Sequence, residues 1–121
     1  MKKILITLTL AVTAAIGLSA CSAPEPIALS ADTTVLDVRT AGEFDAGHLD
    51  GAVNIDVQSA DFDALVAELE PDADYVVYCA SGNRSGAAID RMTGLGFTDL
   101  TDAGGLGEAG ESLGLPTVTG P

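Results

Sequence analysis

The segment Tyr75–Ser85, with the sequence YVVYCASGNRS, decides the fold because it runs from a strand through a loop into a helix. Its first four residues are β-branched or aromatic and show no helical period, which is typical of a buried strand. Small and polar residues follow, among them Gly82, which favours a tight turn. Cys79 is therefore predicted at the point where a buried strand gives way to a loop.

One helix is predicted before this strand in the sequence and one after it. The clearer one spans Ser59–Glu70 and ends at Pro71, and apolar residues recur in it at helical spacing. Its expected inner face carries Phe62, Leu65, Val66 and Leu69. The second helix spans Arg84–Leu95, and its expected inner face carries Ala88, Met92 and Leu95.

Further strands are predicted at Thr33–Val38, Val53–Ile55 and Phe97–Leu100, and a weak final helix at Leu106–Leu113. Strands that alternate with helices indicate an α/β domain of three layers, with a mainly parallel central sheet flanked by helices. Ligands of such sheets bind beyond the carboxyl ends of the strands. Cys79 is expected at this edge.

The chain has 121 residues, enough for one domain, and it is strongly acidic, with 18 acidic and 5 basic residues and a formal net charge of −13. A surface of this sign repels nucleic acid, so we exclude DNA or RNA binding. It is also what a solvated, soluble surface looks like. Few cations remain, and one of them, Arg84, follows closely after Cys79.

The first residues have the layout of a secretory signal peptide. Lys2 and Lys3 precede the apolar run Ile4–Leu18, and small residues lead to Cys21. The sequence Leu18-Ser19-Ala20-Cys21 resembles the lipobox of bacterial lipoproteins, which implies a diacylglyceryl group on the Cys21 sulfur and an extracytoplasmic location at the cell membrane. The alternative is a secreted protein with Cys21 left as a free thiol. The apolar run is too short for a spanning helix.

These features divide the chain into four parts. Residues 1–20 are predicted to be the signal peptide and residues 21–31 a lipidated tether, with Pro24 and Pro26 among small neighbours. Residues 32–116 are the predicted domain, and residues 117–121 a flexible tail. A lipidated Cys21 cannot form a disulfide, so Cys79 is expected to be a lone thiol, which invites a chemical explanation.

The loop after Cys79 is suited to holding an anion. Backbone N–H groups of a short glycine-containing loop can point to its centre, and the helix that follows adds its positive end. A sulfur at that centre is stabilised as a thiolate, the nucleophilic form of cysteine. Arg84 offers a planar donor fork for an oxyanion. The alternatives are a buried structural cysteine and a surface arginine.

Three blocks of the sequence together resemble the rhodanese family of sulfurtransferases. The first comprises Leu36–Arg39, Glu43-Phe44 and Gly47–Ile55. The second is Val76–Ser85, with the Cys-x-x-Gly-x-Arg pattern of single-domain members, and the third comprises Gly94–Phe97 and Ala103–Leu106. The blocks span residues 34–106 in the family's order, and the export signal makes the chain most similar to the small periplasmic members.

The resemblance implies a double displacement. The Cys79 thiolate would attack the outer sulfur of thiosulfate or a related donor, release sulfite and keep the sulfur as a persulfide, which a thiophilic acceptor such as cyanide or a thiol then takes. No metal and no organic cofactor is implied. The loop residues that would bind the substrate are Ala80, Ser81, Gly82, Asn83, Arg84 and Ser85.

The remaining signature residues are interpreted as structural support. Asp37, Arg39, Glu43 and His48 are expected to tie the first loop to the sheet, and Arg39 is spaced to pair with Glu43. His48 could instead be a general base, but a thiolate already stabilised by its loop needs none.

Two other functions remain open. The domain could be a sulfur carrier or a partner-binding module without catalysis of its own. A thiol-based phosphatase or arsenate reductase is the third possibility. The loop disfavours it, since four residues separate Cys79 from Arg84 and the family's phosphatase relatives have one more.

Overall fold

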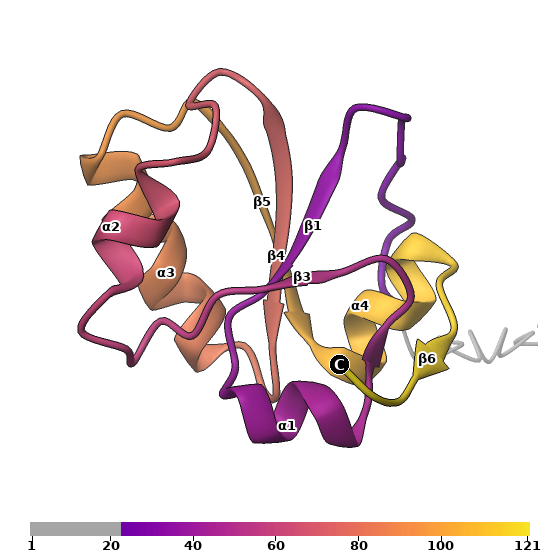
Figure 1. Cartoon of the computed structure of the whole chain (residues 1–121). Coiled ribbons are helices and arrows are strands. Elements are labelled where there is room, and N and C mark those ends of the chain that lie inside the picture. The colour runs from indigo at the N-terminus through magenta and orange to yellow at the C-terminus, as the bar shows by residue number, and fades with distance from the viewer. Residues whose placement is uncertain (1–22) are drawn as a thin grey trace, which may run out of the picture.

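The strand predicted before Cys79 lies inside a parallel sheet of the order β3-β1-β4-β5 (Figure 1). These strands are β1 (Thr34–Asp37), β3 (Val53–Asn54), β4 (Asp74–Cys79) and β5 (Asp99–Gly105). All three pairings are parallel, so the carboxyl ends of β1, β4 and β5 meet at one edge. The expectation of a mainly parallel central sheet flanked by helices is confirmed.

This computed structural model describes residues 23–121. The predicted signal peptide and Cys21 lie outside the described residues. Within the described part, no helix is both long enough and apolar enough to span a bilayer.

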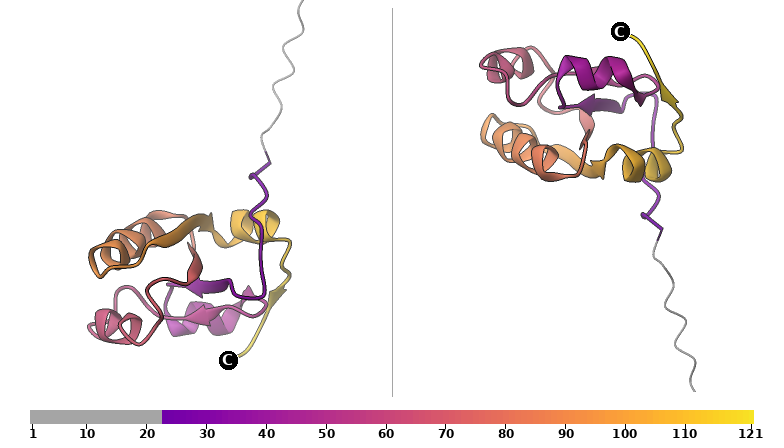
Figure 2. Two further views of the ribbon diagram at one scale, coloured as in Figure 1. Left: turned by 90° about the horizontal axis from the view of Figure 1, so that it is seen from above. Right: turned by 90° about the horizontal axis from the view of Figure 1, so that it is seen from below.

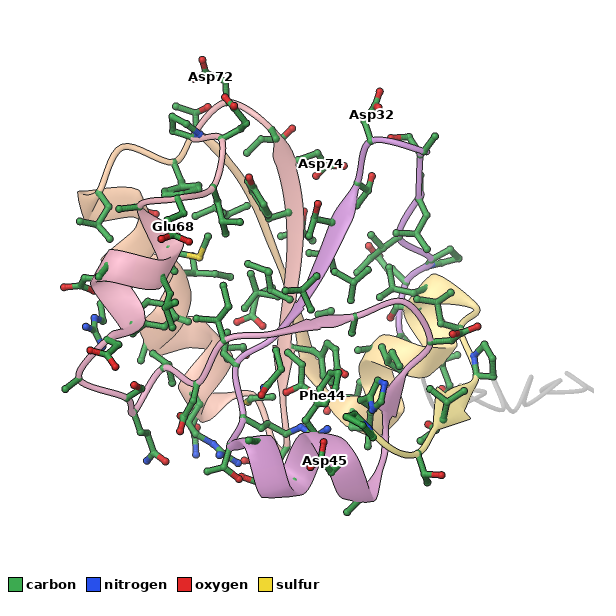
Figure 3. The ribbon with its side chains drawn as sticks, in the orientation of Figure 1. Asp32, Phe44, Asp45, Glu68, Asp72 and Asp74 are labelled. Carbon is green, nitrogen blue, oxygen red and sulfur yellow. The ribbon has the colours of Figure 1, made fainter. Side chains whose placement is uncertain are left out.

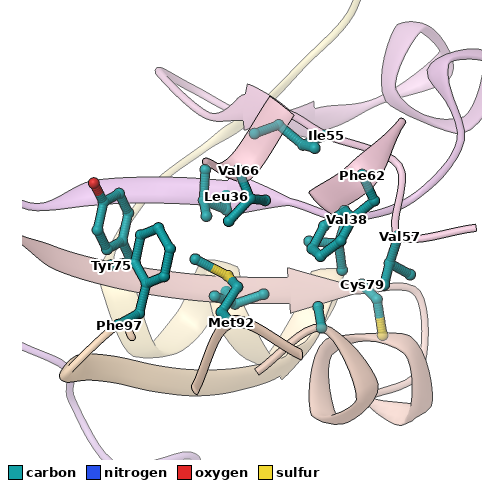
Figure 4. Packing of buried hydrophobic residues seen from close by; sticks show 12 residues of the cluster. Leu36, Val38, Ile55, Val57, Phe62, Val66, Tyr75, Cys79, Met92 and Phe97 are labelled. Carbon is teal, nitrogen blue, oxygen red and sulfur yellow. The ribbon is translucent and has the colours of Figure 1, made fainter. Parts of the chain in front are cut away.

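Two apolar clusters pack on opposite faces of the sheet, because successive residues of a strand point to opposite sides. One cluster joins β1 and β4 to the helices α2 (Phe62–Val66) and α3 (Asn83–Gly94), and Figure 4 shows it from close by. The other joins the same strands to α4 (Leu106–Leu113). The views in Figure 2 show the helices arranged around the sheet.

Helix α1 (Ala41–Ala46) follows β1 after a short turn and lies beyond the carboxyl ends of the strands (Figure 1). Its start has a complete capping box, in which the Thr40 side chain accepts from the Glu43 N–H and the Glu43 carboxylate accepts from the Thr40 N–H. This device fixes where the Glu43 side chain lies.

The two predicted helices exist, but their inner faces are narrower than expected. Phe62 and Val66 of α2 and Ala88 and Met92 of α3 are fully buried, as predicted. Two leucines assigned to the same faces are exposed, Leu65 at 43% and Leu95 at 45%. Leu65 lies on the outer side of a five-residue helix, and Leu95 follows the last turn of α3.

The carboxyl-terminal residues correct the expectation of a flexible tail. Strand β6 (Thr117–Val118) pairs antiparallel with β2 (His48–Leu49), and the Gly120 N–H donates to the Asp45 carbonyl at 2.9 Å. Single-sequence patterns missed both strands because two residues are too few to show an alternation. The carboxyl-terminal residues therefore hold β2 and the end of α1 in place.

Acidic side chains extend from the outside of the fold (Figure 3). The carboxylates labelled there are Asp32, Asp45, Glu68, Asp72 and Asp74. They come from several elements, so the negative charge is spread around the domain.

Candidate active site

Cys79 is the last residue of β4 and is fully buried. Figure 4 places its sulfur at the margin of the apolar cluster. The Gly82 N–H donates to the sulfur at 2.9 Å. Gly82 has φ of +98°, which glycine adopts without strain, and this conformation turns the chain directly into α3. The strand, loop and helix N-terminus thus enclose one sulfur atom, as the sequence predicted.

The surroundings of the sulfur favour its thiolate. Burial opposes the charged form, but hydrogen bonds from the Ser85 N–H, from the Ser85 side chain and from the N–H groups of Ser81 and Gly82 together outweigh it, so the pKa of the Cys79 thiol is lowered from its ordinary value. The Ser85 side chain contributes to this lowering only where its hydroxyl donates to the sulfur. The Ser85 proton, however, has a nearer and charged acceptor in Asp102.

The six loop residues predicted to bind substrate divide into two groups. The backbone N–H groups of Ser81, Gly82 and Ser85 face the sulfur, and the Ser85 side chain is fully buried. The side chains of Ala80, Ser81 and Asn83 are exposed at the rim. The loop therefore presents backbone donors to the sulfur and small side chains to solvent.

Arg84 is already paired in this structure. Its two terminal nitrogens donate to the two carboxylate oxygens of Glu43 at 2.7 and 2.9 Å. This bidentate contact lowers the pKa of Glu43 to about 2, while burial of Glu43 works in the opposite direction and the Thr40 donors add to the lowering. The guanidinium fork expected to face an anion thus links α3 to α1, and Cys79 is among the groups whose charge raises the pKa of Arg84.

Asp37 and Arg39 form a buried pair beneath the loop, with the Arg39 Nη2 donating to the Asp37 Oδ2 at 2.7 Å. The Tyr78 hydroxyl donates to the same oxygen at 2.7 Å and accepts from the Leu49 N–H at 3.0 Å. Arg39 also donates to the Gly47 carbonyl. These contacts join the ends of β1 and β4 to β2. Arg39 pairs with Asp37, so its expected pairing with Glu43 is wrong.

His48 is buried and contacts α1. Its Nδ1 lies 2.7 Å from the Phe44 carbonyl, which makes this nitrogen the one that carries the proton. Its ring stacks on the Phe44 ring with centroids 3.6 Å apart. These contacts fit a residue that holds α1 against β2.

Asp102 is a site residue that the sequence did not reveal. It lies on β5, and its Oδ1 accepts from the Ser85 hydroxyl at 2.8 Å and from the Gly104 N–H at 2.9 Å. Strand β5 has a bulge here, since Asp102 is opposite Val77 while Gly104 is opposite Tyr78. An acidic residue at the carboxyl end of a predicted parallel strand was the available signal, but the strand was predicted to end at Leu100.

The described residues hold no cluster of three or more histidine, cysteine, aspartate or glutamate side chains arranged for a metal ion. The polar groups that surround Cys79 are its backbone donors and a small set of charged side chains.

Comparison with known proteins gives a consistent picture. A family model described as a rhodanese-like domain matches residues 23–105. The thiosulfate sulfurtransferase PspE of Escherichia coli (strain K12) is 29% identical over 70% of this chain and 78% of its own. The thiosulfate sulfurtransferase GlpE of Pseudomonas putida (strain GB-1) is 39% identical over 59% of this chain and 63% of its own, slightly less than two thirds of that relative.

Solved structures agree with the sequence comparison. A rhodanese with anions from E. coli superposes with a TM-score of 0.61 and 28% identity, over 73% of this chain and 99% of that one. A rhodanese-related protein from Thermoplasma volcanium superposes with a TM-score of 0.60 and 36% identity, over 72% of this chain and 84% of that one.

Proposed function

This chain belongs to the rhodanese-like domain family of sulfurtransferases, and on that premise we propose that it transfers sulfane sulfur from a small donor to a thiophilic acceptor through a persulfide on Cys79. The observation that carries the proposal is the buried Cys79 sulfur, which is surrounded by backbone N–H donors at the end of β4. A lowered thiol pKa is what a nucleophilic cysteine requires.

The reaction has two displacements. In the first, the Cys79 thiolate attacks the outer sulfur of thiosulfate, a sulfur–sulfur bond forms to Cys79, and sulfite leaves with the electron pair of the broken bond. In the second, an acceptor such as cyanide or a thiol attacks the outer persulfide sulfur, and the electron pair returns to Cys79. The loop N–H groups can stabilise negative charge on sulfur in both states.

Sulfur transfer fits this site better than phosphoryl transfer. A phosphatase of this kind needs an arginine fork for the equatorial oxygens of phosphate. Arg84 is held by both oxygens of Glu43, and the loop between Cys79 and Arg84 has only four residues. The group that a sulfurtransferase moves is one sulfur atom, which needs less space in the loop than a phosphoryl group.

We also propose that the enzyme is held on the outer side of a bacterial cell membrane by a lipid on Cys21. The support is the lipobox sequence and the basic and apolar residues that precede it. Its test is palmitate labelling of the full chain beside a Cys21→Ala variant, with the label expected only on the unaltered chain.

The sulfurtransferase proposal is tested by the mass of Cys79 after exposure to thiosulfate. Trypsin cleaves after Arg39 and Arg84, and the fragment 40–84 contains Cys79 as its sole cysteine. The full chain is treated with thiosulfate, capped with iodoacetamide and digested. One extra sulfur on this fragment, together with free sulfite, is the expected result.

Cys79→Ser is the control and is expected to gain no sulfur and release no sulfite. If the unaltered chain also gains none, from thiosulfate or from a low-molecular-weight persulfide, the sulfurtransferase proposal is wrong. If the persulfide forms but cyanide and thiols do not remove it, the domain is a carrier that delivers its sulfur to a protein.

A further inference from the structure

The Ser85 hydroxyl lies between the nucleophile and a carboxylate. Its oxygen is 3.6 Å from the Cys79 sulfur and 2.8 Å from the Asp102 Oδ1. Cys79 and Ser85 are fully buried, whereas Asp102 reaches the surface. A line of hydrogen-bonding groups therefore connects the buried sulfur to a charged group at the edge of the sheet.

A serine hydroxyl has one proton and several possible acceptors here. The Gly82 carbonyl, at 2.9 Å, is neutral, and the Cys79 sulfur is more distant, whereas the Asp102 carboxylate is both close and charged. Charged acceptors form the stronger hydrogen bonds. The Gly104 N–H donates to the same Asp102 oxygen and fixes its position. The Ser85 hydroxyl thus donates its hydrogen bond to Asp102, and the lone pairs of the hydroxyl face the sulfur.

We propose that Asp102 is a positioning residue for the nucleophile, which holds the Ser85 hydroxyl turned away from the Cys79 sulfur and so makes the thiolate more basic. A hydroxyl in this orientation can accept from the Cys79 thiol but gives nothing to the thiolate. The negative charge of Asp102 acts on the sulfur in the same direction.

A more basic thiolate attacks faster once formed and leaves more slowly. If the proposed sulfur transfer takes place, Asp102 thus favours loading of Cys79 and retards release of sulfur to the acceptor. The inference on thiol basicity does not depend on that function, since alkylation of Cys79 needs no sulfur donor.

Other charges lie around this group and must be kept constant in a test. Arg84 of α3 carries a charge opposite to that of the thiolate and interacts electrostatically with Cys79. Glu108 of α4 lies beside Gly104, and Glu25 of the amino-terminal segment shares a surface hollow with Asp102 and Glu108. Replacing Asp102 by Asn removes one charge, leaves these groups in place and offers the Ser85 hydroxyl only a neutral and weaker acceptor, so that the hydroxyl can turn towards the sulfur.

The test is the pH dependence of Cys79 alkylation by iodoacetamide, measured in the full chain on the fragment 40–84. Asp102→Asn is expected to lower the apparent pKa by about one unit. It is also expected to lower the limiting rate at high pH by about threefold, since nucleophilicity falls with basicity. In the same variant, cyanide should remove the persulfide sulfur faster. General damage to the site would slow alkylation at every pH.

Asp99→Asn is the matched control, because Asp99 is an exposed aspartate on the same strand. It is expected to leave the pKa unchanged, and an equal shift would overturn the proposal by showing a general charge effect. Ser85→Ala gives an independent test that does not alter Asp102. Its Cys79 pKa is expected to stay level or fall, and a rise would overturn the proposal, because it would show that Ser85 donates to the thiolate.

The double variant Ser85→Ala with Asp102→Asn shows whether the two residues act together. Asp102→Asn should shift the pKa less when Ser85 is already alanine. An undiminished shift would mean that Asp102 acts by charge alone, and the positioning role would be wrong.

Discussion

A carboxylate that is completely buried, such as Asp37, persists only where donors surround it. Its donors come from Arg39, from the Arg39 backbone and from the Tyr78 hydroxyl. Burial and the Asp37 carboxylate raise the pKa of Tyr78, while the Leu49 N–H and the Arg39 charge work in the opposite direction, so the hydroxyl keeps its proton and remains a donor. Tyr78 is therefore as much a part of the site's support as the residues predicted from the sequence.

Tyr78→Phe is expected to lower the free energy of unfolding by about 2–4 kcal/mol, because it leaves Asp37 short of a donor and the Leu49 N–H without an acceptor. Tyr75→Phe is the matched control. Its hydroxyl donates only to the Glu70 carbonyl near the surface, and its loss should cost about 1 kcal/mol or less. Urea unfolding of both variants measures the difference, and equal losses would contradict the assignment.

The Glu43–Arg84 pair makes stability depend on pH. The native pKa of Glu43 is about 2, below its ordinary value of 4.5, so the stabilisation is complete above pH 4.5 and is lost as the pH falls towards 2. Because the side chains are 35% and 24% exposed, solvent screening limits the contribution to about 1 kcal/mol.

Glu43→Gln is expected to remove about this amount at pH 7 and less than half of it at pH 3. Glutamine retains the capping contact with Thr40, so the variant isolates the ion pair. Asp45→Asn, on the exposed side of the same helix, is the control and should show little change at either pH. A difference between Glu43→Gln and the unaltered chain that is as large at pH 3 as at pH 7 would contradict the pKa assignment.

At the scale of single residues, the sequence predicted site residues that can be recognised from their type and position, namely Cys79 at a strand end and Arg84 after a glycine-containing loop. It did not predict which side chains pair with each other. Arg39 had Glu43 at helical spacing, but the chain turns between them, and Arg84 approaches Glu43 from an element 41 residues away. Such pairings depend on how the elements pack, which local spacing does not encode.

At the scale of the elements, the end of β5 lies directly against the loop that follows Cys79. A Cβ on Gly105 would lie 2.6 Å from the Ala80 carbonyl oxygen, and the obstacle is backbone, which cannot rotate away. Gly105 itself has an ordinary backbone conformation with φ of −83°, so only this contact requires glycine.

Gly105→Ala is expected to push the loop away from β5 and lower the rate of Cys79 alkylation at pH 7 by about tenfold or more, because small displacements at a reacting group are costly. Gly107→Ala is the control, since a Cβ there meets open space in α4, and it should leave the rate unchanged. Equal rates for Gly105→Ala and the unaltered chain would show that the loop does not rest on β5.

Helices and strands were predictable in proportion to their length. The six-residue β4 was found because it is a continuous run of β-branched and aromatic residues, and the twelve-residue α3 because its apolar residues recur at helical spacing. The two-residue strands β2 and β6 were missed, and Leu65 and Leu95 were assigned to the core although their helices end or turn too soon to bury them. Periodicity gives the direction of a helix face, whereas its width depends on what packs against it.

The whole molecule carries a net charge of −13, which opposes the approach of a dianion such as thiosulfate. Salt shortens the range of this repulsion, from about 30 Å at 0.01 M to about 8 Å at 0.15 M. The value of kcat/KM for thiosulfate is therefore expected to rise several-fold over this range. Alkylation by neutral iodoacetamide is the control and should change little; a rate with thiosulfate that falls with salt would contradict the prediction.

The class of fold was predictable because alternating strands and helices in one small chain have few ways to bury their apolar faces. The placement of Cys79 followed from the same topology, since parallel strands bring their carboxyl ends together. Asp102 on β5 and strand β6 could be predicted only from the register and the bulge, which are properties of the assembled sheet.

The amino-terminal part of the described residues contacts the domain at Ile27. The Ile27 N–H donates to the Ser112 carbonyl at 2.8 Å, and the Ile27 side chain packs against the second apolar cluster. With the lipid proposed on Cys21, five residues lie between the anchor and Ile27, a reach of at most about 20 Å when this stretch is fully extended. The domain would then be confined to a thin layer beside the bilayer. Its sulfur acceptors would be those that enter this layer or reside in the membrane.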